Sequence, residues 1–314
     1  MTHSTNVLIF GPGAIGLFYG AQLLRSNTCN VHFLIRSDFD QVQENGIQMV
    51  SDKLGDFHFT DVNLHTDSST LPMIDYVLVC TKTHVNSDIV IKDLPSVVTP
   101  NYTTIVVVQN GLDNERLFDH HFPNNPIIGG ISYVCASRLE PGVVRHFDRG
   151  NLCVGGHRCD QDHVAKLVSL FKSDIGIEVT KTANLRTTRF KKLIWNLVYN
   201  SLSVVLYADT VQLVATDRLL SLARDISLEV IRVAKAAGCS IDQAYADQVV
   251  EITQKMSKYK TSMLVDFDAK RPLELEWLHY SLINVAREVE VEVPLVKMLA
   301  AQLEFLDLRN RGHI

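Results

Sequence analysis

Short apolar runs alternate with helix-like stretches through the first half of the chain. Continuous runs of this kind are typical of strands that are buried on both faces of a sheet. They cover residues 7–10, 31–35, 76–80, 104–108 and 127–129. Between the first two, apolar residues recur at helical spacing over residues 14–25. Strands that alternate with helices predict a mainly parallel, doubly wound sheet.

The pattern changes after residue 131. Over residues 132–156, turn residues interrupt short apolar pieces, which predicts antiparallel strands that extend the first domain. A helix over 162–172 and a last strand near 178–180 follow, and there the strand signal stops.

Almost everything from residue 187 onward has helical periodicity. The expected helices cover 187–206, 218–237 and 241–256, and others follow Pro272 and Pro294. The boundary is expected near residue 184. We therefore predict a first domain over 1–184 and a helical domain over 185–314.

Composition narrows the class of protein. Apolar residues make up 46% of the chain, enough for more than one core, and the net charge of −5 gives no basic surface for nucleic acid or an anionic membrane. The six cysteines show no paired spacing, which suits reduced thiols, and no metal site is predicted. With neither a signal peptide nor a membrane-spanning stretch in view, we expect a cytoplasmic protein.

A glycine-rich turn directly follows the first buried strand and directly precedes a helix. Its residues are Gly11, Pro12, Gly13, Ala14, Ile15 and Gly16, which match GxGxxG. In that setting the glycines allow a tight turn, a close approach of a diphosphate and close packing of helix on strand. An ordinary tight turn is the alternative. The chain is thus predicted to be α/β, with an N-terminal Rossmann-type doubly wound sheet and a C-terminal all-helical domain.

Two cations suggest which dinucleotide binds. Arg36 follows the second strand, where NAD-specific sites usually place a carboxylate, and Lys82 follows the strand at 76–80. Cationic groups there suit the 2′-phosphate of NADP. Alternatively, both are solvated loop residues.

A polar stripe interrupts an apolar helical stretch in the second domain. Lys192, Asn196 and Asn200 are spaced four residues apart, so they share one helical face. Buried asparagines require partners, which a structural interface or a ligand can provide.

Taken in order along the chain, these motifs resemble the ketopantoate reductase (2-dehydropantoate 2-reductase) family. The resemblance runs from the glycine turn through TKTHVN, VVQNGLDN and KKLIWNLVYN to TSML and RPLE. It implies NADPH-dependent reduction of ketopantoate to (R)-pantoate, on the route to pantothenate and coenzyme A. It also mildly favours a homodimer, although the same apolar residues would suit an internal core.

The resemblance also implies a role for each site residue. Lys192 would be the catalytic general acid and Glu274 its acidic partner. The substrate's carboxylate and hydroxyl would be held by Asn196, Asn200 and Ser262. Asn110 would lie beside nicotinamide and substrate, and the 2′-phosphate would be held by Arg36 and Lys82.

This chain departs from the family pattern at four positions, namely Thr210, Trp277, His279 and Tyr280. Such changes could adapt the pocket to another bulky 2-oxo acid, in the manner of a D-2-hydroxyacid dehydrogenase. His279 could instead be a satisfied interface histidine with no catalytic part. A non-catalytic NADPH sensor is the alternative from another class, although a sensor would need neither Lys192 nor Glu274.

Overall fold

The computed structural model describes residues 4–35 and 37–314. Two compact units make up the chain. The first comprises Met1–Gln109 and Asn114–Leu185, and the second comprises Asn110–Asp113 and Arg186–Ile314. The second unit therefore includes a short segment that the sequence assigns to the first domain.

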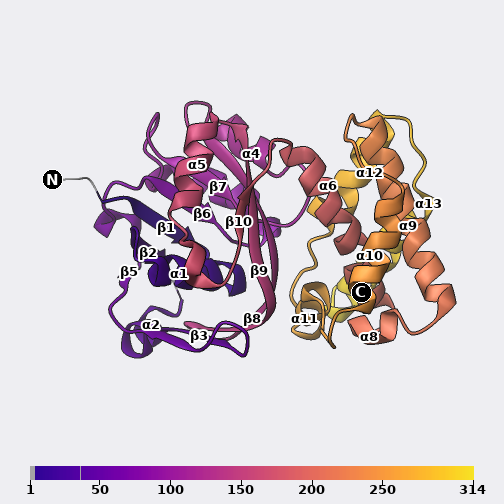
Figure 1. Cartoon of the computed structure of the whole chain (residues 1–314), viewed down its shortest axis with the longest axis horizontal. Coiled ribbons are helices and arrows are strands. Elements are labelled where there is room, and N and C mark those ends of the chain that lie inside the picture. Colours follow the sequence, from indigo (N-terminus) through magenta and orange to yellow (C-terminus); the bar gives the residue numbers. More distant parts are fainter. Residues whose placement is uncertain (1–3, 36) are drawn as a thin grey trace. The chain divides into compact units, whose positions relative to one another are not determined.

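The first unit is built on a ten-stranded mixed sheet, with the order β4-β3-β9-β8-β7-β6-β1-β2-β5 and with β10 paired to β9 (Figure 1). The parallel part contains β1 (Asn6–Phe10), β2 (Asn30–Leu34), β6 (Tyr76–Val79) and β7 (Thr104–Val107). The long strands β8 (Ile127–Glu140) and β9 (Val143–Arg158) pair antiparallel, and β10 (Val179–Lys181) is the last strand. The expected doubly wound sheet and its antiparallel extension are confirmed.

Alternate residues of the central strands belong to two separate cores. Val7 and Ile9 pack with residues of α1 (Ala14–Ser26) and α5 (Gln161–Ser169). Leu8 and Phe10 belong to the other core, with residues of η3 (Ile89–Asp93) and α4 (Glu115–His121). Because successive side chains of a strand point to opposite faces, a strand covered on both faces must be apolar throughout. This explains the continuous apolar runs in the sequence.

Several elements of the first unit give no clear signal in the sequence. They are α2 (Phe39–Asn45), β3 (Ile47–Ser51), β4 (Phe57–Phe59) and β5 (Asn63–His65). The strands β4 and β5 have only three residues each and no fully buried one, so neither produces an apolar run. Their existence depends on hydrogen bonds from a neighbouring strand, which the local pattern does not reveal.

In the described residues after Lys181 there are helices but no strands, as expected. They are α6 (Leu185–Trp195), the π-helix η6 (Asn196–Asn200), α7 (Ser201–Val205), α8 (Thr210–Leu213), α9 (Asp217–Ala236), α10 (Ala244–Gln254), α11 (Ser262–Asp268), the π-helix η7 (Glu276–Tyr280), α12 (Ser281–Glu288) and α13 (Pro294–Asn310). One apolar core joins them. Buried Glu229 of α9 accepts hydrogen bonds from the backbone N–H groups of Leu295 and Val296, so it caps α13. No helix in the described part of the chain is long and apolar enough to cross a membrane.

Candidate active site

The glycine turn, residues 11–16, leaves an open space at the carboxyl end of β1, which we call the cradle. Gly11 has a φ of +85°, and a Cβ there would lie 2.4 Å from Thr81 Cγ2. A Cβ on Gly16 would lie 2.5 Å from the Gly11 carbonyl oxygen, whereas a Cβ on Gly13 would meet no atom of the described residues within 4 Å. In the part of the chain that the structure describes, no side chain makes a capping hydrogen bond at the N-terminus of α1. The backbone thus leaves open space at Gly13 beside a helix N-terminus, and these features fit the diphosphate of a dinucleotide.

The ends of neighbouring strands are held together beside this cradle. Gln109 Nε2 donates to the Thr81 carbonyl oxygen at 2.9 Å and to Asn86 Oδ1 at 2.7 Å, and Asn86 Nδ2 donates back to Gln109 at 3.1 Å. Half-buried Lys82 comes directly after Thr81, close beyond the end of β6. Arg36, the other cation expected there, lies outside the described residues.

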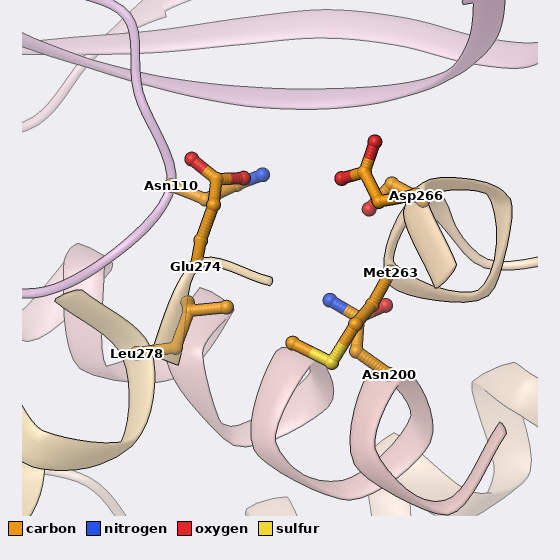
Figure 2. Close-up of a pocket in the computed structure, with 7 residues that line it drawn as sticks. Asn110, Asn200, Met263, Asp266, Glu274 and Leu278 are labelled. Carbon is orange, nitrogen blue, oxygen red and sulfur yellow. The ribbon is translucent and has the colours of Figure 1, made fainter. Parts of the chain in front are cut away.

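A small pocket lies within the second unit. It is lined by Asn110, Asn200, Ser262, Met263, Asp266, Glu274 and Leu278. Figure 2 shows Asn110 and Glu274 on one wall, with Asp266 facing them. Four of the residues expected to form the site therefore meet here: Asn110, Asn200, Ser262 and Glu274.

Asn110 belongs to the second unit because the short segment that carries it is anchored there. The backbone N–H of Leu112 donates to the Trp277 carbonyl oxygen at 3.1 Å, and Asp113 forms an ion pair with Arg186 at 3.2 Å. Gly111 and Asp113 both have positive φ, at 117° and 59°. This sharply turned segment holds Asn110 in the same unit as Glu274.

Asn196 and Asn200 lie at the two ends of the π-helix η6. Each is 2% exposed, and Asn200 Nδ2 donates to Asn196 Oδ1 at 3.4 Å. Among the described residues, Asn196 Nδ2 and Asn200 Oδ1 have no hydrogen-bond partner. Whichever way the two amides are oriented, one bond between them leaves one donor and one acceptor unused. Unpaired buried polar atoms are costly, and π-helical turns are frequent at functional sites.

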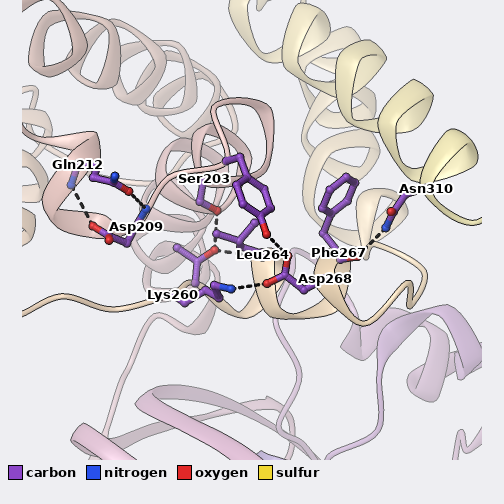
Figure 3. Close-up of polar contacts among 10 residues, drawn as sticks. Ser203, Asp209, Gln212, Lys260, Leu264, Phe267, Asp268 and Asn310 are labelled. Atoms are coloured by element: carbon purple, nitrogen blue, oxygen red, sulfur yellow. Dashed lines mark hydrogen bonds and ion pairs between the residues drawn. The ribbon is translucent and has the colours of Figure 1, made fainter.

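Hydrogen bonds from Ser203 of α7 connect the end of η6 with the start of α11. Ser203 Oγ donates to the Asn200 carbonyl oxygen at 2.7 Å and lies 2.6 Å from Thr261 Oγ1. Thr261 caps α11 by accepting from the backbone N–H of Leu264 at 3.3 Å (Figure 3). Ser262, the next residue, is thereby placed at the pocket close to Asn200.

Lys192 lies one helical turn before Asn196, near the end of α6. It is partly buried, and its ammonium lies 5.5 Å from the centre of the Trp195 ring. Lys192 and Asn196 are not among the residues that line the pocket.

Comparison with known proteins assigns the family. Residues 7–158 match the family model "Ketopantoate reductase PanE/ApbA", and residues 184–307 match "Ketopantoate reductase PanE/ApbA C terminal". The chain belongs to the ketopantoate reductase family. A 2-dehydropantoate 2-reductase of Nostoc sp. is 36% identical over 96% of this chain and 95% of its own length. The crystal structures of 2-dehydropantoate 2-reductases from Geobacter metallireducens and Methylococcus capsulatus are also similar. The Geobacter structure has 34% sequence identity and a TM-score of 0.89, and the match covers 95% of this chain and 99% of the other. The Methylococcus structure has 33% sequence identity and a TM-score of 0.87, and the match covers 97% of each chain.

The four departures from the ketopantoate reductase pattern do not line the described pocket. Thr210 is fully buried, and its hydroxyl donates to the Ser257 carbonyl oxygen and accepts from the Tyr259 N–H. His279 is fully buried, with Nε2 2.7 Å from Ser201 Oγ. Both side chains make hydrogen bonds within the second unit, and His279 Nδ1 has no hydrogen-bond partner among the described residues. Tyr280 donates to Glu304 at 2.8 Å, and Trp277 uses its carbonyl oxygen to hold Leu112.

Three pocket residues were missed in the sequence, namely Met263, Asp266 and Leu278. For Asp266 a signal was available, because Ser262 and Asp266 are four residues apart and so share one face of a helix. Leu278 gave no such signal, because an apolar residue in a helical pattern indicates a core position whether or not it borders a pocket.

His279 makes the stability of this protein depend on pH. Burial lowers its pKa to about 3, so the folded protein keeps the ring neutral while the unfolded chain protonates it near pH 6.5. The contribution of His279 to the free energy of unfolding is present above pH 6.5 and is lost as the pH falls below that value. By linkage we expect the free energy of unfolding to drop by about 3 kcal/mol between pH 7 and pH 4 from this residue.

Fluorescence can follow this loss because both tryptophans, Trp195 and Trp277, lie in the second unit. Denaturant unfolding at several pH values should give a flatter pH dependence for His279→Gln than for the wild type. The exposed His58 serves as the matched control, and His58→Gln should keep the wild-type slope. Equal slopes for His279→Gln and the wild type would contradict the prediction.

Proposed function

We propose that this protein is a cytoplasmic NADPH-dependent 2-dehydropantoate 2-reductase that converts ketopantoate to (R)-pantoate. The observation that carries the proposal is the pocket of the second unit, which brings together Asn110, Asn200, Ser262 and Glu274. Membership of the family supports the same reaction. The six cysteines are all free, which suits a reducing compartment.

The unused amide oxygen of Asn200 suits the proposed substrate. Asn200 lines the pocket, and a substrate hydroxyl can donate a hydrogen bond to its Oδ1. Ketopantoate carries such a hydroxyl beside its 2-oxo acid group. The Ser262 hydroxyl and the Asn110 amide add donors suited to a carboxylate. The pocket therefore offers hydrogen bonds matched to the polar groups of a hydroxylated 2-oxo acid.

The cofactor is proposed to be NADPH, held through its diphosphate at Gly13 and through its 2′-phosphate by Lys82 and Arg36. When bound, the reduced nicotinamide supplies the hydride that adds to the 2-keto carbon. Negative charge then develops on the ketone oxygen, and the Lys192 ammonium stabilises it and donates the proton. Glu274 is assigned to orient Lys192 and to favour its cationic form.

The activity is tested by following NADPH oxidation with ketopantoate as substrate, beside a panel of other 2-oxo acids. We expect ketopantoate to have the highest kcat/KM. Preference for another bulky 2-oxo acid would keep the reaction class and replace the substrate. Tight binding of NADPH without reduction of any member of the panel would contradict the enzymatic function and favour a sensor.

A further inference from the structure

The pocket contains two carboxylates although the proposed substrate is itself an anion. Asp266 and Glu274 both line it, and Figure 2 shows them facing each other across the space. Like charges repel more strongly in a partly buried pocket than in water. Each of these carboxylates therefore weakens the binding of a 2-oxo acid unless a cation balances its charge. Lys192 is assigned to Glu274, so the balance of charge at Asp266 depends on other groups. This inference rests on the proposed function.

Arg271 is placed to neutralise Asp266. Its Nε donates to Asp266 Oδ1 at 2.9 Å, and its backbone N–H donates to the Asp266 carbonyl oxygen at the same distance. Of the Asp266 side chain only 6% is exposed, compared with 52% of Arg271. The carboxylate is therefore desolvated while its cationic partner reaches solvent. Removing the cation of such a pair reduces the compensation of a buried charge.

A second ion pair on the same helix does not share this position. Asp268 pairs with Lys260 and accepts a hydrogen bond from Tyr207 at 3.0 Å (Figure 3). Asp268 is exposed and is not among the pocket residues, and the side chain of Lys260 is 51% exposed. This pair is similar in type and close in sequence, but it has no carboxylate at the pocket.

We propose that Arg271 determines specificity for anionic substrates by neutralising Asp266. It acts through Asp266, so it is a positioning residue. It also holds the turn after α11, whose closing residue Lys270 donates to the Phe267 carbonyl oxygen. A purely structural role for Arg271 and the electrostatic role make opposite predictions when Asp266 loses its charge.

The test compares steady-state kinetics of R271Q, D266N, the double variant D266N/R271Q and the control K260Q. We expect R271Q to raise KM for ketopantoate about tenfold or more, with kcat changed less than about threefold, because about 1.4 kcal/mol of lost binding corresponds to tenfold. D266N should lower KM, since it removes a repelling charge. The double variant should return KM to within about threefold of the wild type, and K260Q should leave it unchanged.

Each result decides the proposal. An unchanged KM in R271Q overturns it, as does a double variant with a KM as high as that of R271Q, because removal of the Asp266 charge should then have restored substrate binding. If R271Q does not fold, a raised KM in D266N overturns it instead. A wild type that does not reduce ketopantoate contradicts the proposed function. If the wild type reduces ketopantoate normally but the variants give one of the contradicting KM values above, only the role of Arg271 is contradicted.

Discussion

Replacing Lys192 with alanine is expected to lower kcat for ketopantoate by about 10²–10⁴-fold, the usual contribution of a general acid. Without the ammonium, the charge that develops on the ketone oxygen has no cationic partner and the proton must come from water. KM should change far less, because the asparagine and serine side chains that we assign to substrate binding remain. Steady-state NADPH oxidation measures both constants.

Lys191 provides a matched control for this substitution. It is the adjacent residue of α6 and is also partly buried, and its ammonium lies 5.4 Å from the centre of the Tyr245 ring. Lys191→Ala removes the same side chain from the same helix and should leave kcat within about threefold of the wild type. Equal losses in both variants would indicate a general effect on α6, and a nearly unchanged kcat in Lys192→Ala would remove Lys192 from the reaction.

Gly13→Ala is expected to weaken NADPH binding by tenfold or more, which corresponds to about 1.4 kcal/mol or more, without destabilising the protein. The backbone of Gly13 has a φ of −78° and a ψ of −161°, which alanine adopts without strain, and the new methyl group meets no atom of residues 4–35 and 37–314 within 4 Å. That methyl group would instead occupy the space left open for the diphosphate. Calorimetric titration with NADPH and a thermal melt of the free protein measure the two effects.

Gly16→Ala should behave in the opposite way. Its methyl group would lie 2.5 Å from the Gly11 carbonyl oxygen, so the contact between α1 and the glycine turn must open. Overpacking of this kind costs about 1–3 kcal/mol and lowers Tm even without cofactor. Gly13→Ala with normal NADPH affinity, or with a Tm as low as that of Gly16→Ala, would contradict the role assigned to Gly13.

Much of the fold follows from local sequence patterns. The strands β1, β2, β6 and β7 were predicted because burial on both faces makes every residue of a central strand apolar. The periodicity of α9 was equally clear, since one face of this long helix packs into the core. The edge strands β4 and β5 were missed, because their hydrogen bonds come from distant segments and their residues are not fully buried.

The sequence by itself thus determined the two-part architecture, the family and the residue types of the candidate site. These depend on spacing along the chain, on glycine where the backbone needs it, and on polar residues within apolar helical surroundings. Only the tertiary structure decided that the segment of Asn110 belongs with the helical unit, that Asp266 faces Glu274, and that Thr210 and His279 are engaged in structural hydrogen bonds. Those facts depend on contacts between residues far apart in the chain, and no local pattern records them.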